Sequence, residues 1–229
     1  MTGRTLSLYA LAAAAAVSLG AASSQSAVQQ RLAEIKQSIV RNKAQLRQYA
    51  WTETTEISLK GEVKKREQND CMYGPDGNVQ KTLIGAPPAP ANKPGIRGKI
   101  VANKIADLKD YMDRVGSLLR RYIPPDPQAM QAAFAAGKVT LIPVSGQLVF
   151  NDYAKPGDKV TVTFDQATKR LLSFAVATYL DAPKDTVTVN ARFSSLPDGT
   201  NFLQESVLIA SAKEIQITKT NFGYRRLGA

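Results

Sequence analysis

Apolar and polar residues alternate along much of the chain, and this period of two is typical of β-strands with one buried face. Residues 186–193 carry an apolar residue at every second position, and residues 202–209 form a second, largely apolar run. The segment SSLPDGTNF, at 194–202, lies between them. Proline fixes φ at the first corner of a turn, and Asp-Gly accepts the positive φ of the second corner. The pattern therefore predicts a β-hairpin, and the Pro-Asp-Gly at 75–77 predicts another.

The same periodicity predicts about nine strands over the whole chain. Three of them follow one another between residues 49 and 84, and the others run from residue 139 to a last strand at 214–222. Nearly all are joined by short turns, which makes neighbouring strands antiparallel. Strands such as 171–180 carry apolar residues on both sides, which is expected of a sheet that helices cover on one face.

A period of three to four residues predicts helices at 28–48, 99–122 and 127–136. Asp126 is expected to cap the start of the third helix, and Gly137 is expected to end it. Together with the strands, these helices define an α+β fold. The expected buried side of the second helix consists of Val101, Ile105, Leu108, Met112, Val115 and Leu119.

Residues 1–27 have the features of a secretory signal peptide, because a basic start, a short apolar segment and small residues follow one another. We expect cleavage between Ala22 and Ala27 and a soluble product that is periplasmic or secreted. Residues 28–229 are expected to form a single domain. Within it, the segment at 85–98 has four prolines and three glycines, which predicts a long loop.

The chain has 30 Lys and Arg against 19 Asp and Glu, a net charge of +11. Removal of residues 1–27 takes away one arginine and no acid, which leaves +10. A basic exported protein is attracted to anionic lipid headgroups or acidic envelope polymers, although the charge could also serve solubility alone. No nucleic-acid motif is visible, so nucleic acid is not an expected partner. The candidates for contact with an anionic surface are Lys60, Lys64, Lys65 and Arg66.

The composition restricts the chemistry that the chain can perform. The sequence has no His, which excludes a His-based triad, a His general base and a His-ligated metal. It has one cysteine, Cys71, which excludes an internal disulfide and favours a buried free thiol over an intermolecular disulfide. No nucleophile and base pair is recognisable, so we expect a protein that is not an enzyme and has no cofactor or metal.

Glu53 is the one acidic residue on the apolar side of the strand at 49–59. It could be a carboxylate in an apolar pocket with a raised pKa, which would suit acid–base chemistry. The alternative is an ion pair with a Lys or Arg of a covering helix, or a position near the edge of the sheet. We favour this alternative because acidic side chains are rarely buried without a partner.

The order of these elements resembles the outer-membrane lipoprotein carrier family (LolA-like fold). The likeness is carried mainly by FDQATKRLLSF and KEIQITKTNFGYRR, at 164–174 and 213–226, which resemble the late hairpin and the closing strand of that family. The resemblance implies a curved antiparallel sheet that forms an open half-barrel, with helices on its concave face around an apolar cavity. The Arg-Pro-x-x-Phe-Arg-Trp motif of the family has no counterpart, so no individual functional residue is transferred.

The sequence therefore predicts a non-enzymatic binder or carrier that holds lipid or lipoprotein acyl chains in an apolar cavity. We expect the protein to be a monomer. Its expected partners are an acyl-chain ligand and an anionic membrane surface or envelope protein. The alternative is a periplasmic interaction or sensor module that binds a protein or an anionic polymer. The candidate ligand-binding residues are Trp51, Ile57, Met112, Leu148, Phe150, Phe174 and Phe193.

Overall fold

The computed structural model describes residues 30, 33–34, 37–38, 40–85 and 96–228, without the side chains of 96–102 and 127. The chain divides into two compact units, Met1–Arg41 and Asn42–Ala229. The described positions of the first unit from residue 30 onward are helical, and the second unit begins with helical residues 42–46. Both findings agree with the helix predicted at 28–48. The predicted signal peptide, at 1–27, lies outside the described residues.

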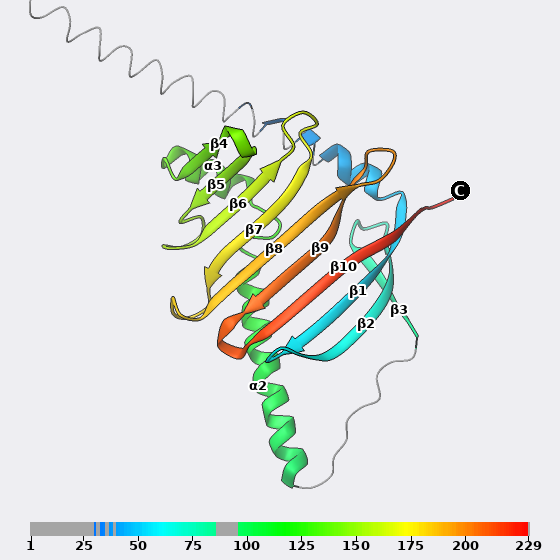
Figure 1. The fold of residues 1–229 in the computed structure, drawn as a ribbon, viewed down its shortest axis with the longest axis vertical. Coiled ribbons are helices and arrows are strands. Elements are labelled where there is room, and N and C mark those ends of the chain that lie inside the picture. The colour runs from blue at the N-terminus through cyan, green and yellow to red at the C-terminus, as the bar shows by residue number, and fades with distance from the viewer. Residues whose placement is uncertain (1–29, 31–32, 35–36, 39, 86–95, 229) are drawn as a thin grey trace, which may run out of the picture. The chain divides into compact units, whose positions relative to one another are not determined.

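The second unit contains one sheet of ten antiparallel strands, which confirms the α+β class and exceeds the expected number by one (Figure 1). The strands follow the order β3-β2-β1-β10-β9-β8-β7-β6-β5-β4, so β3 and β4 are its edges and the sheet is not closed. The strands are β1 (Tyr49–Leu59), β2 (Glu62–Tyr73), β3 (Val79–Ile84), β4 (Val139–Ile142), β5 (Gln147–Asn151), β6 (Lys159–Phe164), β7 (Leu171–Tyr179), β8 (Thr186–Ser195), β9 (Asn201–Ala210) and β10 (Ile215–Arg226).

Every neighbouring pair of strands is consecutive in sequence except one. β1 pairs with β10, and their register places Glu53 opposite Asn221 and Ile57 opposite Ile217. This ladder joins the three-strand meander β1–β3 to the seven-strand series β4–β10. The two predicted Pro-Asp-Gly turns connect β2 to β3 and β8 to β9, and Gly77 and Gly199 have the positive φ that they require.

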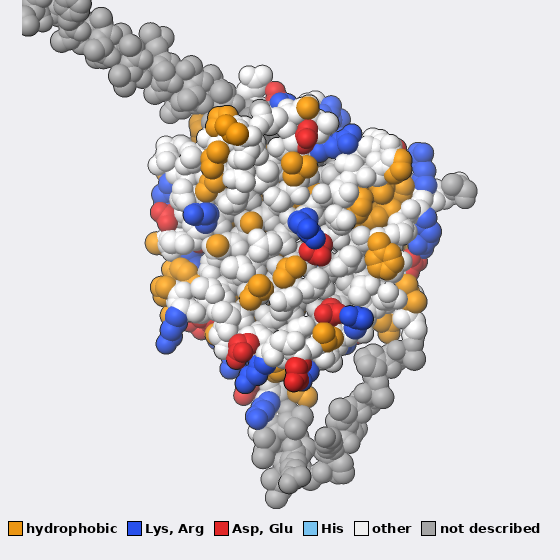
Figure 2. Space-filling view, viewed as in Figure 1, with side chains coloured by type: hydrophobic (Ala, Val, Ile, Leu, Met, Phe, Trp, Pro, Cys, Tyr) orange, Lys and Arg blue, Asp and Glu red, His pale blue; other side chains and the backbone are white. Residues whose placement is uncertain are grey.

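The register divides the side chains of the sheet into an apolar face and a polar face. On the polar face the strands carry mainly threonine and other uncharged polar residues, among them Thr54, Thr161, Thr188 and Thr220. Figure 2 looks onto this polar face, where charged and apolar side chains are scattered. The apolar face includes Trp51, Ile57, Cys71, Leu148, Phe150, Val160, Val162, Phe174, Val176, Val187, Val189, Phe193, Leu208, Ile215 and Ile217.

Two α-helices lie between β3 and β4 in the sequence, α2 (Ile96–Leu119) and α3 (Pro127–Ala135). α3 begins as predicted, because the Asp126 side chain accepts a hydrogen bond from Gln128 N at 2.9 Å, and Gly137 follows it with φ of 68°. Two short 3₁₀ helices, η1 (Pro143–Ser145) and η2 (Ser211–Lys213), complete the described elements. None of the described helices combines the length and the apolar character needed to cross a membrane.

The buried side of α2 differs from the predicted one. The side chains that are buried in the structure are Tyr111, Val115 and Leu118, followed by Tyr122 just beyond the helix. Of the predicted stripe, only Val115 is buried, and Ile105 is 59% exposed. Val101 lies outside the described side chains. The prediction counted aliphatic residues alone, whereas two tyrosines determine which side of the helix faces the sheet.

These tyrosines fasten α2 to one end of the sheet by hydrogen bonds to aspartates. The Tyr111 hydroxyl donates to Asp185 Oδ1 at 2.7 Å, and the Tyr122 hydroxyl donates to Asp158 Oδ2 at 2.6 Å. The Tyr122 oxygen also lies 2.9 Å from Thr178 Oγ1, whose side chain is on the apolar face of β7. The C-terminal end of α2 therefore lies over the apolar face. Figure 1 agrees with this placement, because α2 runs behind the sheet there.

Both tyrosine pKa values lie above their ordinary range, because burial and the hydrogen bond to a carboxylate disfavour the phenolate. A tyrosine whose pKa is higher in the folded than in the unfolded state stabilises the fold as long as it is neutral. This contribution is complete below the unfolded pKa of about 10 and is lost as the pH rises through the folded pKa. We therefore expect the free energy of unfolding to fall steeply above pH of about 10.

Replacing Tyr111 and Tyr122 by phenylalanine should lower the free energy of unfolding at pH 7 by about 1–3 kcal/mol for each residue. It should also flatten the loss of stability at alkaline pH, because both perturbed groups are gone. Urea denaturation between pH 7 and pH 11.5 measures both effects, with Tyr179→Phe as the control, since the Tyr179 hydroxyl bonds an exposed carbonyl of Pro156. An unchanged alkaline profile in the double variant contradicts this account.

Candidate ligand-binding face

Six of the seven predicted ligand-binding residues belong to strands, and the register places all six on the apolar face. Trp51 and Ile57 lie on β1, and Phe193 lies on β8. The other three are Leu148 and Phe150 on β5 and Phe174 on β7. The seventh, Met112, lies on α2 and is half-buried.

The six residues fall into two environments along this face. Leu148, Phe150 and Phe174 are buried where the sheet runs from β5 to β7, and Phe150 packs edge-to-face on Tyr153 with the ring centres 6.0 Å apart. They form part of the packed core. Ile57 and Phe193 are only half-buried, as are other apolar side chains of this part of the face, namely Leu208 and Ile217. The apolar face is thus less covered at these four residues of β1, β8, β9 and β10, although Val187, Val189 and Ile215 of the same strands are buried.

Trp51, which is 6% exposed, anchors an aromatic cluster at one end of this region. Its ring lies 5.5 Å from the ring centre of Tyr73 and stacks on Tyr224 at 5.6 Å with an angle of 12° between the planes. Phe202 follows at 4.4 Å from Tyr224. Burial, as the largest cause, raises the pKa of Tyr73 and of Tyr224, so both hydroxyls stay neutral.

Sequence reasoning did not include Tyr224 in this cluster because the last strand was predicted to end at Phe222, whereas β10 continues to Arg226. Strict alternation over the longer strand would place Tyr224 on the polar face with Phe222. The structure interrupts the alternation at Gly223, which has φ of 64°, where the β1–β10 register also shifts. A residue in the left-handed region changes the side to which the next side chain points. Gly223, in the sequence NFGYRR, was a signal from which this reversal of sides could have been suspected.

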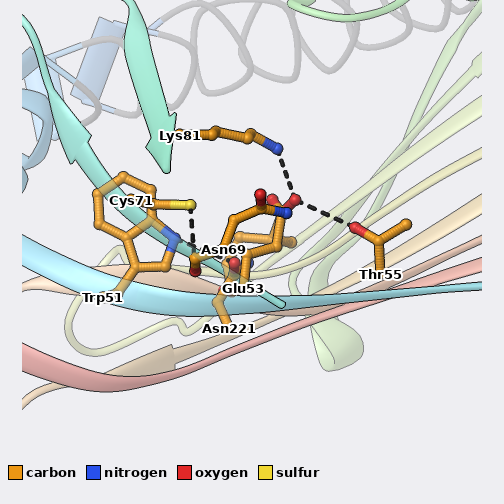
Figure 3. A network of polar contacts seen from close by, with 8 residues as sticks. Trp51, Glu53, Thr55, Asn69, Cys71, Lys81 and Asn221 are labelled. Atoms are coloured by element: carbon orange, nitrogen blue, oxygen red, sulfur yellow. Dashed lines mark hydrogen bonds and ion pairs between the residues drawn. The ribbon is translucent and has the colours of Figure 1, made fainter. Parts of the chain in front are cut away.

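A chain of hydrogen bonds links this cluster to the neighbouring strands (Figure 3). The Trp51 indole Nε1 donates to Asn221 Oδ1 at 3.1 Å, and Asn221 Nδ2 donates to the backbone oxygen of Leu203 at 2.9 Å. Asn221 is 6% exposed, and these two hydrogen bonds give both of its side-chain polar atoms a partner inside the sheet. The side chains of β1, β10 and β9 are thereby held in one arrangement.

Glu53, also on the apolar face, forms an ion pair rather than an apolar carboxyl site. Its Oε1 lies 2.5 Å from Lys81 Nζ and accepts a hydrogen bond from Thr55 Oγ1 at 3.1 Å (Figure 3). Burial by itself raises the pKa of Glu53, but the Lys81 hydrogen bond and the charge of Lys219 outweigh it, and the pKa is lowered. The favoured interpretation of Glu53 is confirmed, with the lysine coming from edge strand β3 instead of a helix.

Cys71 lies opposite Trp51 on β2 and is fully buried, as predicted for a free thiol. Its Sγ is 3.8 Å from the backbone oxygen of Asn69. Burial and the nearby charge of Glu53 raise the pKa of the Cys71 thiol, which keeps it protonated. The cysteine therefore contributes to packing at this site.

The four predicted basic residues do not form a uniform positive surface. Lys65 pairs with Glu67 at 2.6 Å, Lys64 pairs with Glu62, and Arg66 pairs with Glu56. Lys65 lies on the side of Ile57, whereas Arg66 lies on the polar face opposite Glu56. Lys60 occupies the β1–β2 turn. Four cations and three carboxylates leave a local charge of +1.

A shallow depression of about 360 Å³ lies on the polar face. Of the predicted residues it contains only Arg66, which belongs to the basic group rather than to the ligand-binding one. Its lining residues are Thr54, Glu56, Arg66, Gln68, Thr218, Thr220 and Phe222. Within the described part of the chain, no cluster of three or more His, Cys, Asp or Glu side chains could hold a metal ion.

Comparisons of the chain with protein-family models, with curated proteins and with solved structures found no match.

Breaking the Glu53–Lys81 pair should destabilise the protein at neutral pH. Lys81→Met leaves a buried carboxylate without its main partner, and we expect a loss of about 1–2 kcal/mol at pH 7. Because the pKa of Glu53 is lower in the folded than in the unfolded state, its ionised carboxylate stabilises the fold. This contribution is present above the ordinary pKa and is lost as the pH falls through the folded pKa. The difference between the variant and the wild type should therefore shrink below about pH 4.5.

Denaturation followed by the fluorescence of Trp51, the single tryptophan of the chain, measures this difference. Lys64→Met is the matched control, because its partner Glu62 is exposed and surface pairs of this kind contribute little. Equal stabilities of Lys81→Met and the wild type at pH 7 would show that the pair is not stabilising.

Proposed function

We propose that this protein is an exported, non-enzymatic binder or carrier of lipid or lipoprotein acyl chains. The apolar face of the sheet, around β8, β9, β10 and β1, would hold the chains. The single observation that carries the proposal is the half-buried apolar surface of Ile57, Phe193, Leu208 and Ile217, next to a fully packed core.

The physical argument concerns what such a surface gains from an acyl chain. A methylene group that leaves water for an apolar environment contributes about 0.8 kcal/mol. A wide sheet that is apolar on one side leaves surface that a single helix stripe does not cover. The described part of α2 supports this view, because its buried residues run only from Tyr111 to its end and residues 103–107 are exposed.

The proposal includes a particular arrangement of sheet and helices. The sheet would be curved as an open half-barrel, and α2 and the helix that ends at residue 46 would lie on its concave side. An acyl chain would then be enclosed between sheet and helices. The tyrosine anchors at the C-terminal end of α2 support a helix that is fixed at one end and can yield at the other.

The proposal also places the protein at an anionic surface in the periplasm or outside the cell. Without residues 1–27 the net charge is +10, which attracts such a surface over a distance of about a Debye length. The strip of Lys60, Lys64, Lys65 and Arg66 would meet the headgroups. Lys65 supports this placement because it lies on the same face as Ile57.

A lysine introduced into the apolar face should prevent acyl-chain binding. In Ile57→Lys the lysine ammonium group would have to be buried beneath the acyl chain. We therefore expect the affinity for a fluorescent long-chain fatty acid to fall at least about tenfold. Ser58→Lys is the matched control, because Ser58 is the next residue of β1 and lies opposite Gln216 on the other face. Titration at constant protein concentration measures both variants.

The control variant should bind the probe as the wild type does. If the wild type shows no saturable binding of any acyl probe, the apolar face is filled by side chains. The protein is then better described as an interaction or sensor module. If Ile57→Lys and Ser58→Lys bind equally well, the ligand occupies another surface.

Attachment to anionic vesicles should depend on the basic strip. The double variant Lys64→Glu/Lys65→Glu should bind vesicles of phosphatidylglycerol and phosphatidylcholine more weakly than the wild type at low salt, with the difference vanishing in about 1 M salt. Its affinity for the fatty-acid probe should change little. Vesicle sedimentation at several salt concentrations measures the effect.

The variant Lys159→Glu/Lys184→Glu has the same change of charge at two exposed lysines, on β6 and in the β7–β8 turn, which the strand order separates from the strip, and serves as the control. It should retain more vesicle binding than Lys64→Glu/Lys65→Glu. Equal losses in the two variants would mean that total charge, rather than this strip, determines attachment.

A further inference from the structure

Edge strand β3 presents an open backbone edge. All six of its residues are exposed, and among the strands of the described residues it borders β2 alone. The opposite edge strand, β4, has four residues and is followed directly by Pro143 in η1. Long open edges are sites at which another strand can pair, and natural proteins usually protect them.

The turn between β2 and β3 shows which backbone groups point outward. Gly74 N donates to the backbone oxygen of Asn78 at 2.8 Å, which makes that pair hydrogen-bonded. Because hydrogen-bonded and non-bonded pairs alternate in an antiparallel ladder, Gln80, Thr82 and Ile84 direct their backbone groups toward β2. The N–H and C=O groups of the residues between them, Val79, Lys81 and Leu83, point away from the sheet.

The one protective feature of this edge, within the described residues, is Lys81, a lysine on the apolar face, and its charge is neutralised by Glu53. β3 contains no proline, and the β2–β3 register has no shift or bulge. Its apolar side chains are exposed on both faces, with Val79 at 40%, Leu83 at 37% and Ile84 at 47%. Met72 of β2 adds a further exposed apolar side chain beside Gln80. An added strand would cover this apolar surface and satisfy the free backbone groups at once.

The edge is electrically neutral, although the chain is strongly basic. β2 has six charged residues and β3 has one, and each of the seven forms an ion pair within the chain. An acidic strand would therefore find no unpaired cation on β3 itself, whose one charged residue is Lys81. A second copy of the chain would meet no net repulsion there. The pairs are Lys64–Glu62, Lys65–Glu67, Arg66–Glu56, Lys81–Glu53 and Arg225–Asp70.

We propose that β3 pairs in antiparallel fashion with β3 of a second copy of this chain, about a two-fold axis at Thr82. This register places Thr82 opposite Thr82 of the second copy, Lys81 opposite its Leu83, and Gln80 opposite its Ile84. The outward N–H and C=O groups of Lys81 then bond those of Leu83 in the second copy, and those of Leu83 bond those of Lys81 in the second copy. A register centred on Lys81 would set two lysines directly opposite each other, which is unfavourable. The dimer replaces the monomer expected from the sequence, and it does not rest on the proposed function.

Proline at position 83 provides a selective test. The Leu83 N–H points outward, so Leu83→Pro removes no bond between β2 and β3, and proline is tolerated at such an edge position. Leu83→Ala is the control that keeps the N–H. The wild type should show a concentration-dependent dimer in sedimentation velocity. Leu83→Pro should weaken that dimer at least about tenfold, because two symmetry-related hydrogen bonds are lost, and more than Leu83→Ala does.

A cysteine at position 82 tests the register. Thr82 of the two copies would form a non-hydrogen-bonded pair with Cα atoms about 4.5 Å apart, within the range of a disulfide. Thr82→Cys should therefore form a covalent dimer under mild oxidation, whereas Gln80→Cys should not. The native Cys71 is fully buried and does not compete. A wild type that is monomeric at all concentrations, a dimer unaffected by Leu83→Pro, or a failure of Thr82→Cys to cross-link faster than Gln80→Cys overturns the proposal.

Discussion

The pairing of β1 with β10 is the contact on which the arrangement of the sheet depends. It brings together residues that are about 170 positions apart, as in the hydrogen bond from Trp51 to Asn221. Without it, β1–β3 would be a three-strand meander with one apolar side and no neighbouring strand. With it, Trp51, Ile57 and Cys71 continue an apolar face that begins at β4 and β5. A contact between residues so far apart in the sequence has a high entropic cost of loop closure. Side-chain hydrogen bonds such as that of Trp51 help to offset this cost as well as to fix the local geometry.

The apolar face has two regions with different properties, and the β1–β10 pair belongs to the second. From β5 to β8 the side chains are buried, and Tyr122 and Tyr111 hold α2 against that end of the sheet. Around β9, β10 and β1 the apolar side chains of Ile57, Leu208 and Ile217 are only half-buried, while the aromatic rings of Trp51 and Tyr224 close one end. A packed region gives rigidity and a less covered region gives a surface that can take up an apolar ligand, so a single sheet can serve both purposes.

The sequence predicted those features that depend on neighbouring residues. The strand at 49–59, the turns at 75–77 and 197–199 and the cap at Asp126 were all recognisable, because alternation and turn chemistry act over a few positions. The buried side of α2 was not predictable in the same way. It is determined by aspartates on loops far along the chain, which make Tyr111 and Tyr122 buried residues despite their hydroxyls.

The candidate site shows the same division. Alternation correctly gathered Trp51, Ile57 and Phe193 on one face, since each strand has a period of two. It failed at Tyr224, where a single glycine with positive φ reverses the side of the following residue. The partner of Glu53 was also out of reach of local patterns, because Lys81 comes from β3, two strands away, and the order of strands has to be known first.

Charge is distributed in a way that total composition does not reveal. The chain has a net charge of +11, yet all seven charged residues of β2 and β3 are paired with a residue of opposite sign. The excess positive charge must therefore lie on other parts of the chain. A neutral edge favours close contact with another strand, since no charge has to be desolvated without a partner. A basic remainder favours long-range attraction to anionic surfaces. β3 pairs with residues 68–73 of β2, whereas the basic strip proposed for attachment lies at residues 60–66. Self-association at β3 and attachment through that strip would thus use different parts of the sheet and need not compete.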